Sequence, residues 1–224
     1  IEGLESYLKK MPDKKNLETI KHIQDKSEVL HVGCNMIKHE DIKKINDKPV
    51  ILWNHRWEHD KNPEDFFNVL YKVKENKIDF ALVIVGESFS NYPECFDGAR
   101  VKLNKEILHI GYCDSKKDYH KWLLKSDVIP VTSNQDFFGI SIVEAISAGV
   151  YPILPSRLSY PEILDIKNNL EIFYANNDTL YDKLFHYLNN YKVLRKSTSK
   201  YEKLINRFDW RNMIDIYDET FEKY

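Results

Sequence analysis

From Pro49 onward, short apolar runs alternate with amphipathic segments, and this alternation constrains the fold more than any other feature of the chain. The runs are rich in β-branched residues and nearly continuous in apolar character, as parallel strands buried on both faces are. Strands that alternate with helices predict a doubly wound α/β domain, with a Rossmann-like parallel sheet of about six strands. The predicted strands are 50–53, 80–86, 107–111, 128–133, 151–155 and 170–175.

The segments between these runs carry the signals of helix ends. Asn62 followed by Pro63 predicts an N-cap and a first helical residue. Ser115 with Asp118 resembles a capping box, and Gly149 suits the position that follows a helix end. Behind the last strand the chain is expected to be helical, at about 178–190, 192–206 and 211–223.

Residues 1–48 lack the regular alternation that follows them. Residues 1–26 are polar and predicted to be helical, and 27–33 are a candidate strand. Residues 34–48 have no clear periodicity, so we interpret them as a linker. We therefore expect a boundary between 48 and 49, with the α/β domain and its C-terminal helices spanning 49–224.

Composition limits the class of protein. The 224 residues suffice for one large domain, or for one domain and a piece of another. The net charge of -2 does not indicate a general affinity for nucleic acid or acidic lipid. Three cysteines without CxxC spacing predict reduced thiols in a cytoplasmic protein. No apolar run approaches the roughly 18 residues of a membrane span, no signal peptide is visible, and Ile1 in place of methionine is typical of a fragment.

The loops that follow the strands are where a doubly wound domain binds its ligands. Loop 54–62 contains Arg56 and Lys61 just before a predicted helix N-terminus, and these groups together suit a diphosphate. No GxGxxG or GxxxxGK[ST] motif accompanies them, so such a phosphate site would be made of side chains. The alternative is a surface cluster of ion pairs with Glu58 and Asp60.

Two acids follow the fourth predicted strand. Asp136 comes just after the strand, and Glu144 lies eight residues later within an apolar helix. A carboxylate in such a helix needs a polar partner, and ribose or sugar hydroxyls are suitable partners. Gly139 lies at the predicted helix start, where a ligand can approach the backbone closely. The alternative is an acid that complements the helix dipole, together with an ordinary surface glutamate.

Three further features carry separate hypotheses. His55 and His59 have the i, i+4 spacing of metal ligands, but they lie in a predicted loop without an HExxH context. Tyr112 follows the third strand and could stack on a nucleotide base or pack on the sheet. A basic helix face could contact RNA or simply be solvated. Its cations are Lys192, Arg195, Lys196, Lys200, Lys203 and Arg207.

Taken in order, these motifs resemble the C-terminal, donor-binding domain of retaining GT-B glycosyltransferases of family four. The order is the Arg56 and Lys61 loop, VIVGE, HIGY, Asp136-x7-Glu144 with FG inside it, and AGVYPILP followed by YPEIL. The usual signature of that family is Glu-x7-Glu. The aspartate at position 136 therefore shortens one of the two side chains by a methylene group.

Longer stretches resemble one branch of that family, in which the acceptor is the queuosine nucleoside of tRNA. They are WNHRWEHDKNPEDFF, DFFGISIVEAISAGVYPILPSRLSYPEI, FDW and MPDKKNLETIKHIQDKSEVLHVG. The resemblance implies that 1–48 are the end of an N-terminal, acceptor-binding domain and a linker, and that 49–224 bind the nucleotide sugar. The implied donor is GDP-mannose, and the implied acceptor is queuosine in a tRNA.

The resemblance also implies a role for each matching residue. Arg56 and Lys61 would hold the donor diphosphate and stabilise the leaving group, and Asp136 would bind hydroxyls of the donor sugar. These three are the expected catalytic residues. The other donor-binding residues would be Tyr112 at the base, Glu144 at the ribose, Phe138, Gly139 and Ile140 through their backbone, and Glu87 at the edge of the site.

The implied chemistry is transfer of a sugar with retention at its anomeric carbon. Arginine, lysine and a helix N-terminus would neutralise the departing diphosphate, so neither a metal nor a cofactor is expected. Two alternatives stay open. One is a family-four enzyme that uses a UDP- or ADP-sugar on a glycan or lipid, and the other is a non-catalytic nucleotide-binding module.

Overall fold

The computed structural model describes residues 2–37 and 46–223. The chain divides into two compact units, one up to His31 and one from Val32 onward. The smaller unit contains the helices α1 (Glu2–Lys9) and α2 (Glu18–Asp25), so the helical prediction for 1–26 is confirmed in part, and 10–17 are not helical. The predicted boundary between 48 and 49 stays a prediction.

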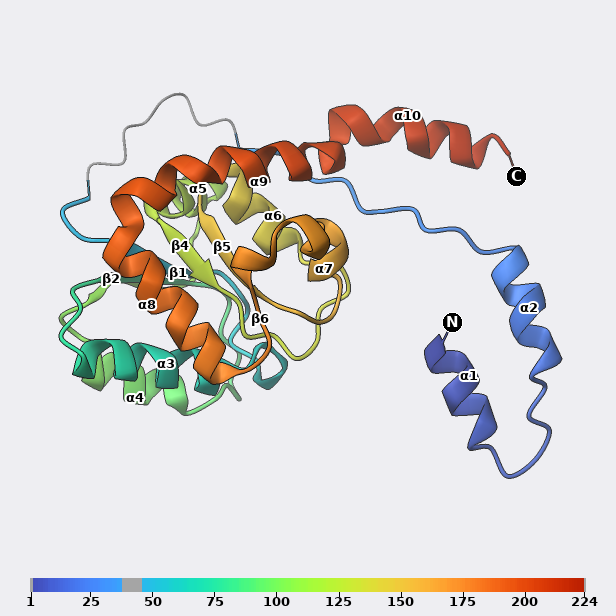
Figure 1. Ribbon diagram of the computed structural model, residues 1–224, viewed down its shortest axis with the longest axis horizontal. Coiled ribbons are helices and arrows are strands. Elements are labelled where there is room, and N and C mark those ends of the chain that lie inside the picture. Colours follow the sequence, from blue (N-terminus) through green and yellow to red (C-terminus); the bar gives the residue numbers. More distant parts are fainter. Residues whose placement is uncertain (1, 38–45, 224) are drawn as a thin grey trace. The chain divides into compact units, whose positions relative to one another are not determined.

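Among the described residues, the larger unit has a sheet of six parallel strands in the order β3-β2-β1-β4-β5-β6 (Figure 1). The order runs away from β1 in both directions, so the sheet is doubly wound and the predicted fold class is confirmed. The strands are β1 (Val50–Trp53), β2 (Ala81–Val85), β3 (Ile107–Gly111), β4 (Val128–Pro130), β5 (Tyr151–Pro155) and β6 (Phe173–Tyr174).

Helices cover both faces of the sheet (Figure 1). On one face α3 packs against α4 and α8, and on the other α6 packs against α5 and α9. The helices of this unit are α3 (Pro63–Glu75), α4 (Cys95–Lys102), α5 (Lys116–Lys125), α6 (Ile140–Ser147), α7 (Tyr160–Ile163), α8 (Asn177–Leu194), α9 (Thr198–Ile205) and α10 (Trp210–Phe221). Because of this double cover, every residue of β1 and β2 is buried, which explains their continuous apolar character.

The aromatic residues of the first strand-end loop belong to the core. Trp53 and Trp57 are each 1% exposed. The Trp57 ring stacks on Phe96 of α4, with ring centroids 4.2 Å apart, and Trp53 makes edge contacts with Phe66 of α3 and with Phe96. These rings bury a large apolar area between α3, α4 and the end of β1. The tryptophans therefore fix the path of the loop that carries Arg56.

Several predicted elements differ in the structure. Residues 27–33 are not a strand, because none of the described strands pairs with them and Val29 is 77% exposed. Instead, Cys34 forms a single parallel bridge with Asp209. Of the predicted sixth strand only Phe173 and Tyr174 are extended, since a 3-10 helix precedes them. Most of the predicted linker, 38–45, lies outside the described residues.

The predicted helix signals are confirmed in part. Asp118 donates its backbone N–H to Ser115 Oγ at the start of α5, and Gly149 has a φ of 75° just after α6. Asn62 is the N-cap of α3 and Pro63 is its first residue, as predicted, although the Asn62 side chain makes no capping hydrogen bond. The residue precedes α3 but has a left-handed φ of 51°, and its amide donates to Asp65 Oδ2 instead of accepting from the helix.

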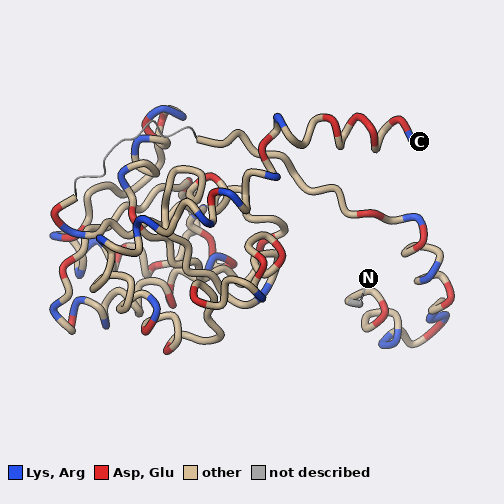
Figure 2. The backbone as a smooth tube through the Cα atoms, turned by 45° about the horizontal axis from the view of Figure 1, so that its top comes forward, with Lys and Arg blue, Asp and Glu red and all other residues tan. Residues whose placement is uncertain are grey.

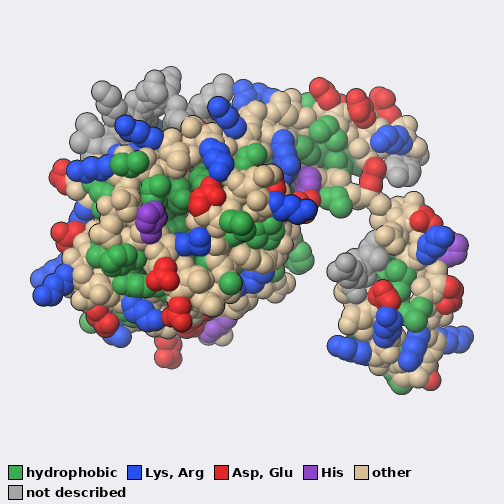
Figure 3. Space-filling view, in the orientation of Figure 1, with side chains coloured by type: hydrophobic (Ala, Val, Ile, Leu, Met, Phe, Trp, Pro, Cys, Tyr) green, Lys and Arg blue, Asp and Glu red, His purple; other side chains and the backbone are tan. Residues whose placement is uncertain are grey.

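Charged residues of both signs are interspersed along the backbone of the larger unit (Figure 2), and their side chains are mixed on the face seen in Figure 3. Part of the predicted basic face is used for internal contacts. Arg195 lies 2.7 Å from Asp127, Lys200 lies 2.8 Å from Glu171, and Arg207 donates to the carbonyl of Glu162. RNA contact by this face stays a prediction.

No helix in the described part of the chain combines the length and apolar character that a membrane span requires.

Candidate functional site

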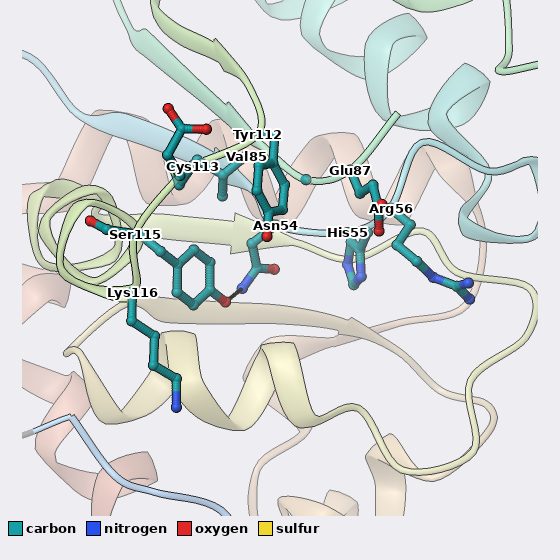
Figure 4. Close-up of a pocket in the computed structure, with 12 residues that line it drawn as sticks. Asn54, His55, Arg56, Val85, Glu87, Tyr112, Cys113, Ser115 and Lys116 are labelled. Carbon is teal, nitrogen blue, oxygen red and sulfur yellow. Dashed lines mark hydrogen bonds between the residues drawn. The ribbon is translucent and has the colours of Figure 1, made fainter. Parts of the chain in front are cut away.

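A pocket of about 360 Å³ opens where β1, β2 and β3 end (Figure 4). Its lining includes three of the predicted site residues, Arg56, Glu87 and Tyr112. It also includes Asn54 and Tyr119, which the sequence did not single out as site residues. The pocket lies beside the point at which the strand order reverses, where open α/β sheets bind their ligands.

Arg56 is on the outer side of this pocket, and Figure 4 shows its side chain extending away from Asn54 and Tyr112. Its Nη2 lies 3.0 Å from Glu58 Oε2, so the ion pair considered as an alternative does form. The Arg56 side chain is 55% exposed, and exposed pairs of this kind contribute roughly 0–1 kcal/mol. Glu58 therefore does not prevent the guanidinium from turning to a stronger anionic partner.

Lys61 is held against the loop that follows β4. Its Nζ donates to the carbonyl of Gln135 over 2.7 Å and lies 3.2 Å from Asp60 Oδ2. It also lies 3.8 Å from Asp136 Oδ2, and the lysine side chain is only 11% exposed. The structure thus brings Lys61 and Asp136 together, from two loops that are far apart in the sequence.

The loop after β4 leads directly into α6. Gly139 is the N-cap of this helix, with a φ of 97°, a left-handed conformation that favours glycine. Phe138 is half-buried against Phe208, and Ile140 is 43% exposed. A helix start offers N–H groups ahead of the first i−4 hydrogen bond, and in α6 that bond runs from the Val143 N–H to the Gly139 carbonyl over 3.1 Å. Gly139 therefore takes the position at the helix start that the sequence predicted.

Glu144 is one turn into α6, and its Oε2 accepts a hydrogen bond of 3.0 Å from the hydroxyl of Tyr119. Burial, and secondarily the charge of Glu144, raises the pKa of the Tyr119 phenol, so the phenol keeps its proton and donates. Asn54 connects the same helix to β1, because its amide donates to the carbonyl of Ser141 over 2.7 Å. Tyr119 thus links Glu144 to the pocket that it lines.

His55 is buried, with 5% of its surface exposed. Burial, followed by the charge of Lys61, lowers its pKa to about 3, so the imidazole is neutral at physiological pH. Its Nδ1 lies 3.4 Å from Ser141 Oγ. His59 differs in being 72% exposed at its side chain, and the described residues contain no group of three or more potential ligands arranged around a metal position.

The predicted residues fall into three neighbouring groups. Arg56, Glu87 and Tyr112 line the pocket, Lys61 contacts Asp136, and Glu144 contacts Tyr119. Glu87 is exposed, and its backbone carbonyl accepts from Trp57 N–H, while the Tyr112 side chain is 66% exposed. Sequence reasoning did not find Asn54 and Tyr119 as partners of the α6 region, because no local spacing relates positions 54, 119 and 144.

The sheet and its flanking helices have the fold of one half of a GT-B glycosyltransferase. The C-terminal domain of a glycosyl transferase group 1 family protein from Francisella tularensis is similar, with a TM-score of 0.60 and 20% identity, covering 73% of this chain and 87% of that one. Sucrose-phosphate synthase from Thermosynechococcus elongatus is similar, with a TM-score of 0.69 and 14% identity, and the match covers 92% of this chain and 57% of that one.

The chain belongs to the family described as Glycosyl transferases group 1, whose profile matches residues 36–204. Among characterised relatives, the tRNA-queuosine alpha-mannosyltransferase of Drosophila melanogaster is 31% identical over 236 residues. The match covers 100% of this chain and 61% of that protein. The chain therefore spans about three fifths of the length of this relative.

Proposed function

We propose that this chain is the donor-binding part of a retaining glycosyltransferase that uses a nucleotide sugar. The observation that carries the proposal is the convergence of Lys61, Asp136 and Glu144 beside the pocket that Arg56 lines. The cationic groups, the helix start and the two carboxylates lie at one sheet edge. Together they offer a partner for each part of a nucleotide sugar. The diphosphate needs positive charge, and the ribose and the sugar need hydrogen-bond acceptors.

In this proposal Arg56 and Lys61 hold the diphosphate. Arg56 is exposed enough to turn from Glu58 toward a doubly charged anion, while Lys61 is fixed in place by Gln135. A fixed ammonium does not have to reorganise as charge develops on the leaving group, which is how preorganised charge lowers a barrier. Backbone N–H groups of Phe138, Gly139 and Ile140, at the start of α6, add hydrogen-bond donors and partial positive charge for the same diphosphate.

The diphosphate site determines where the other parts of the donor would lie. The nucleotide base occupies the pocket of about 360 Å³ beside Tyr112, with Glu87 at its edge. Glu144 accepts hydrogen bonds from the ribose hydroxyls through the oxygen that Tyr119 does not hold. Asp136 accepts from hydroxyls of the donor sugar, next to Lys61.

The reaction we propose is a front-side displacement. The bond between the anomeric carbon and the phosphate oxygen breaks, and the acceptor oxygen bonds to the same face of that carbon. The acceptor proton passes to an oxygen of the departing diphosphate, whose remaining charge Arg56 and Lys61 neutralise. The proposal requires neither a metal nor a cofactor.

For the complete protein we propose GDP-mannose as the donor and queuosine in tRNA as the acceptor. The support is the 31% identity to a tRNA-queuosine alpha-mannosyltransferase over the whole of this chain. A cytoplasmic location would suit such an acceptor. Binding of GDP, UDP and ADP by the complete protein tests the base, because a specific ligand raises the unfolding temperature by mass action. A rise with UDP or ADP but not with GDP would contradict the proposed donor.

The catalytic assignment is tested with Arg56→Ala and Lys61→Ala in the complete protein. Each should lower turnover of the nucleotide sugar by roughly 100-fold or more, because each removes preorganised charge from the leaving group. Lys72→Ala is the matched control, since Lys72 is 54% exposed on α3 and pairs only loosely with Asp178 at 3.8 Å. Nearly normal turnover in both site variants would rule out this assignment.

A further inference from the structure

The loops that follow β4 and β5 are joined by side chains of the second loop. Arg157 donates to the carbonyls of Thr132 over 2.9 Å and Ser133 over 3.1 Å. Ser159 Oγ donates to the carbonyl of Phe138 over 2.8 Å. All three contacts go to backbone carbonyls, so they set the path of the loop that carries Asp136 without touching its carboxylate.

Tyr160 reaches the carboxylate itself. Its hydroxyl donates to Asp136 Oδ2 over 3.0 Å, and its side chain is 0% exposed. The ring packs on the backbone of Gly139, where an added Cβ would lie 3.0 Å from Tyr160 Cε1. Burial, followed by the charge of Asp136, raises the pKa of the phenol. The phenol therefore remains a donor, and its ring has little room to move.

Both polar contacts of this carboxylate within the described part of the chain are made by Oδ2. One is the Tyr160 hydroxyl, and the other is Lys61 Nζ at 3.8 Å. The Asp136 side chain is 15% exposed, so the carboxylate is still reachable from solvent. A carboxylate has acceptor sites on both oxygens, which leaves Oδ1 to a ligand.

We propose that Tyr160 is a positioning residue, which holds Asp136 Oδ2 so that Oδ1 is presented to a hydroxyl of the donor sugar. This inference rests on the proposed function of Asp136. Aspartate has a short side chain with few rotamers, and one fixed oxygen determines where the other points. Because the geometry is set before the ligand binds, the sugar does not have to order the carboxylate. Tyr160 acts only through Asp136 and does not itself touch the donor.

The test compares GDP-mannose with GDP, which lacks the sugar, by calorimetric titration of the complete protein. Tyr160→Phe keeps the ring and removes the hydroxyl, so it should weaken GDP-mannose binding about tenfold and change GDP binding less than twofold. Asp136→Asn should have at least the same selective effect. Tyr187→Phe is the matched control, because it removes another buried phenol hydroxyl, which donates to the Asp127 carbonyl over 2.9 Å. It should change neither affinity.

The outcomes separate this inference from the proposed function. If Asp136→Asn selectively weakens GDP-mannose and a folded Tyr160→Phe binds it as the wild type does, Tyr160 does not position the carboxylate. If Asp136→Asn also binds normally, the proposed role of Asp136 is wrong and the inference fails with it. If the wild type binds neither GDP ligand, the proposed donor is wrong. UDP-glucose and UDP then test Tyr160 in the same way, since the inference concerns the sugar and not the base.

A second variant covers the case in which Tyr160→Phe does not fold. Asp136→Glu keeps the charge but moves the carboxylate by one methylene, against a Tyr160 ring that is fully buried. We expect GDP-mannose binding to weaken about tenfold while GDP binding stays within twofold. Equal affinities of this variant and the wild type for GDP-mannose would overturn the inference, because the position of the carboxylate would then not matter.

Discussion

The hydroxyl of Tyr119 donates to Glu144 Oε2 over 3.0 Å, and this bond joins α5 to α6 at the edge of the pocket. It gives a polar partner to a carboxylate that lies in an otherwise apolar helix, flanked by the buried Val143 and Ala145. Asn54 Nδ2 donates to the same hydroxyl over 3.3 Å, so the residue that follows β1 takes part in the contact. One carboxylate oxygen is held in this way, and the other is the proposed acceptor for a ribose.

We expect Glu144→Gln to weaken binding of GDP by the complete protein about tenfold, because an amide is a poorer acceptor for two ribose hydroxyls. Tyr119→Phe should have a smaller effect, since the carboxylate remains but is less fixed. Isothermal titration measures both. Glu75→Gln, at the exposed end of α3, is the control and should bind as the wild type does. Unchanged affinity in Glu144→Gln would remove Glu144 from the donor site.

Asp127 is a buried anchor for the C-terminal helices. Its carboxylate accepts from Arg195 over 2.7 Å, and from Asn46 and the Val50 N–H over 2.9 Å each. Asp127→Ala leaves these donors without their acceptor and should lower the free energy of unfolding by about 3 kcal/mol. Denaturant titration measures this value. Lys200→Ala breaks an exposed pair with Glu171 and should cost less than about 1 kcal/mol. Similar losses in the two variants would contradict the anchoring role.

The lowered pKa of His55, about 3, predicts a pH dependence of stability. Between pH 6.5 and about 3 the unfolded chain binds a proton at this histidine and the folded chain does not. The unfolding free energy therefore falls as the pH falls below 6.5, by up to about 1.4 kcal/mol per unit from this group, and the contribution is complete above pH 6.5.

His55→Gln should reduce this slope between pH 6.5 and 5, as measured by denaturant titration at several pH values. The slope is compared within each protein, so a general loss of stability in the variant does not affect the test. His59→Gln is the matched control, because the His59 side chain is 72% exposed. The control should keep the wild-type slope. An identical slope in His55→Gln would show that the imidazole is not kept neutral by the fold.

Two glycines at strand ends offer a matched pair of substitutions. Gly86 has a φ of 154°, and a Cβ added there would lie 2.0 Å from the backbone oxygen of His55. Gly111 has a φ of 129°, but a Cβ added there would meet nothing within 4 Å. Both alanine variants are strained by their φ, so we expect Gly86→Ala to lose about 2 kcal/mol more stability than Gly111→Ala. Thermal unfolding of the two variants measures the difference. Equal losses would mean that the loop after β1 can move aside.

Much of the fold follows from local patterns. The centres of all six strands, the start of α3 at Pro63 and the cap of α5 at Ser115 could be predicted, because each depends on residues within a few positions. The first and last residues of the strands were less predictable, because they depend on how far each strand pairs with its neighbour. Residues 27–33 show this most clearly, because an apolar run forms a strand only where another strand can accept its hydrogen bonds.

At the candidate site, local patterns were enough to predict which residues stand at the ends of the strands. Arg56, Lys61, Asp136 and Glu144 lie in loops or a helix turn at one sheet edge, because parallel strands bring their carboxyl ends together. Their partners depend on how the loops and helices pack against one another. Lys61 turns to the Gln135 carbonyl, Tyr119 reaches Glu144, and Tyr160 reaches Asp136. These contacts join residues that are 24 to 74 positions apart in the sequence. They depend on packing between elements, and a local pattern in the sequence carries no information about that packing.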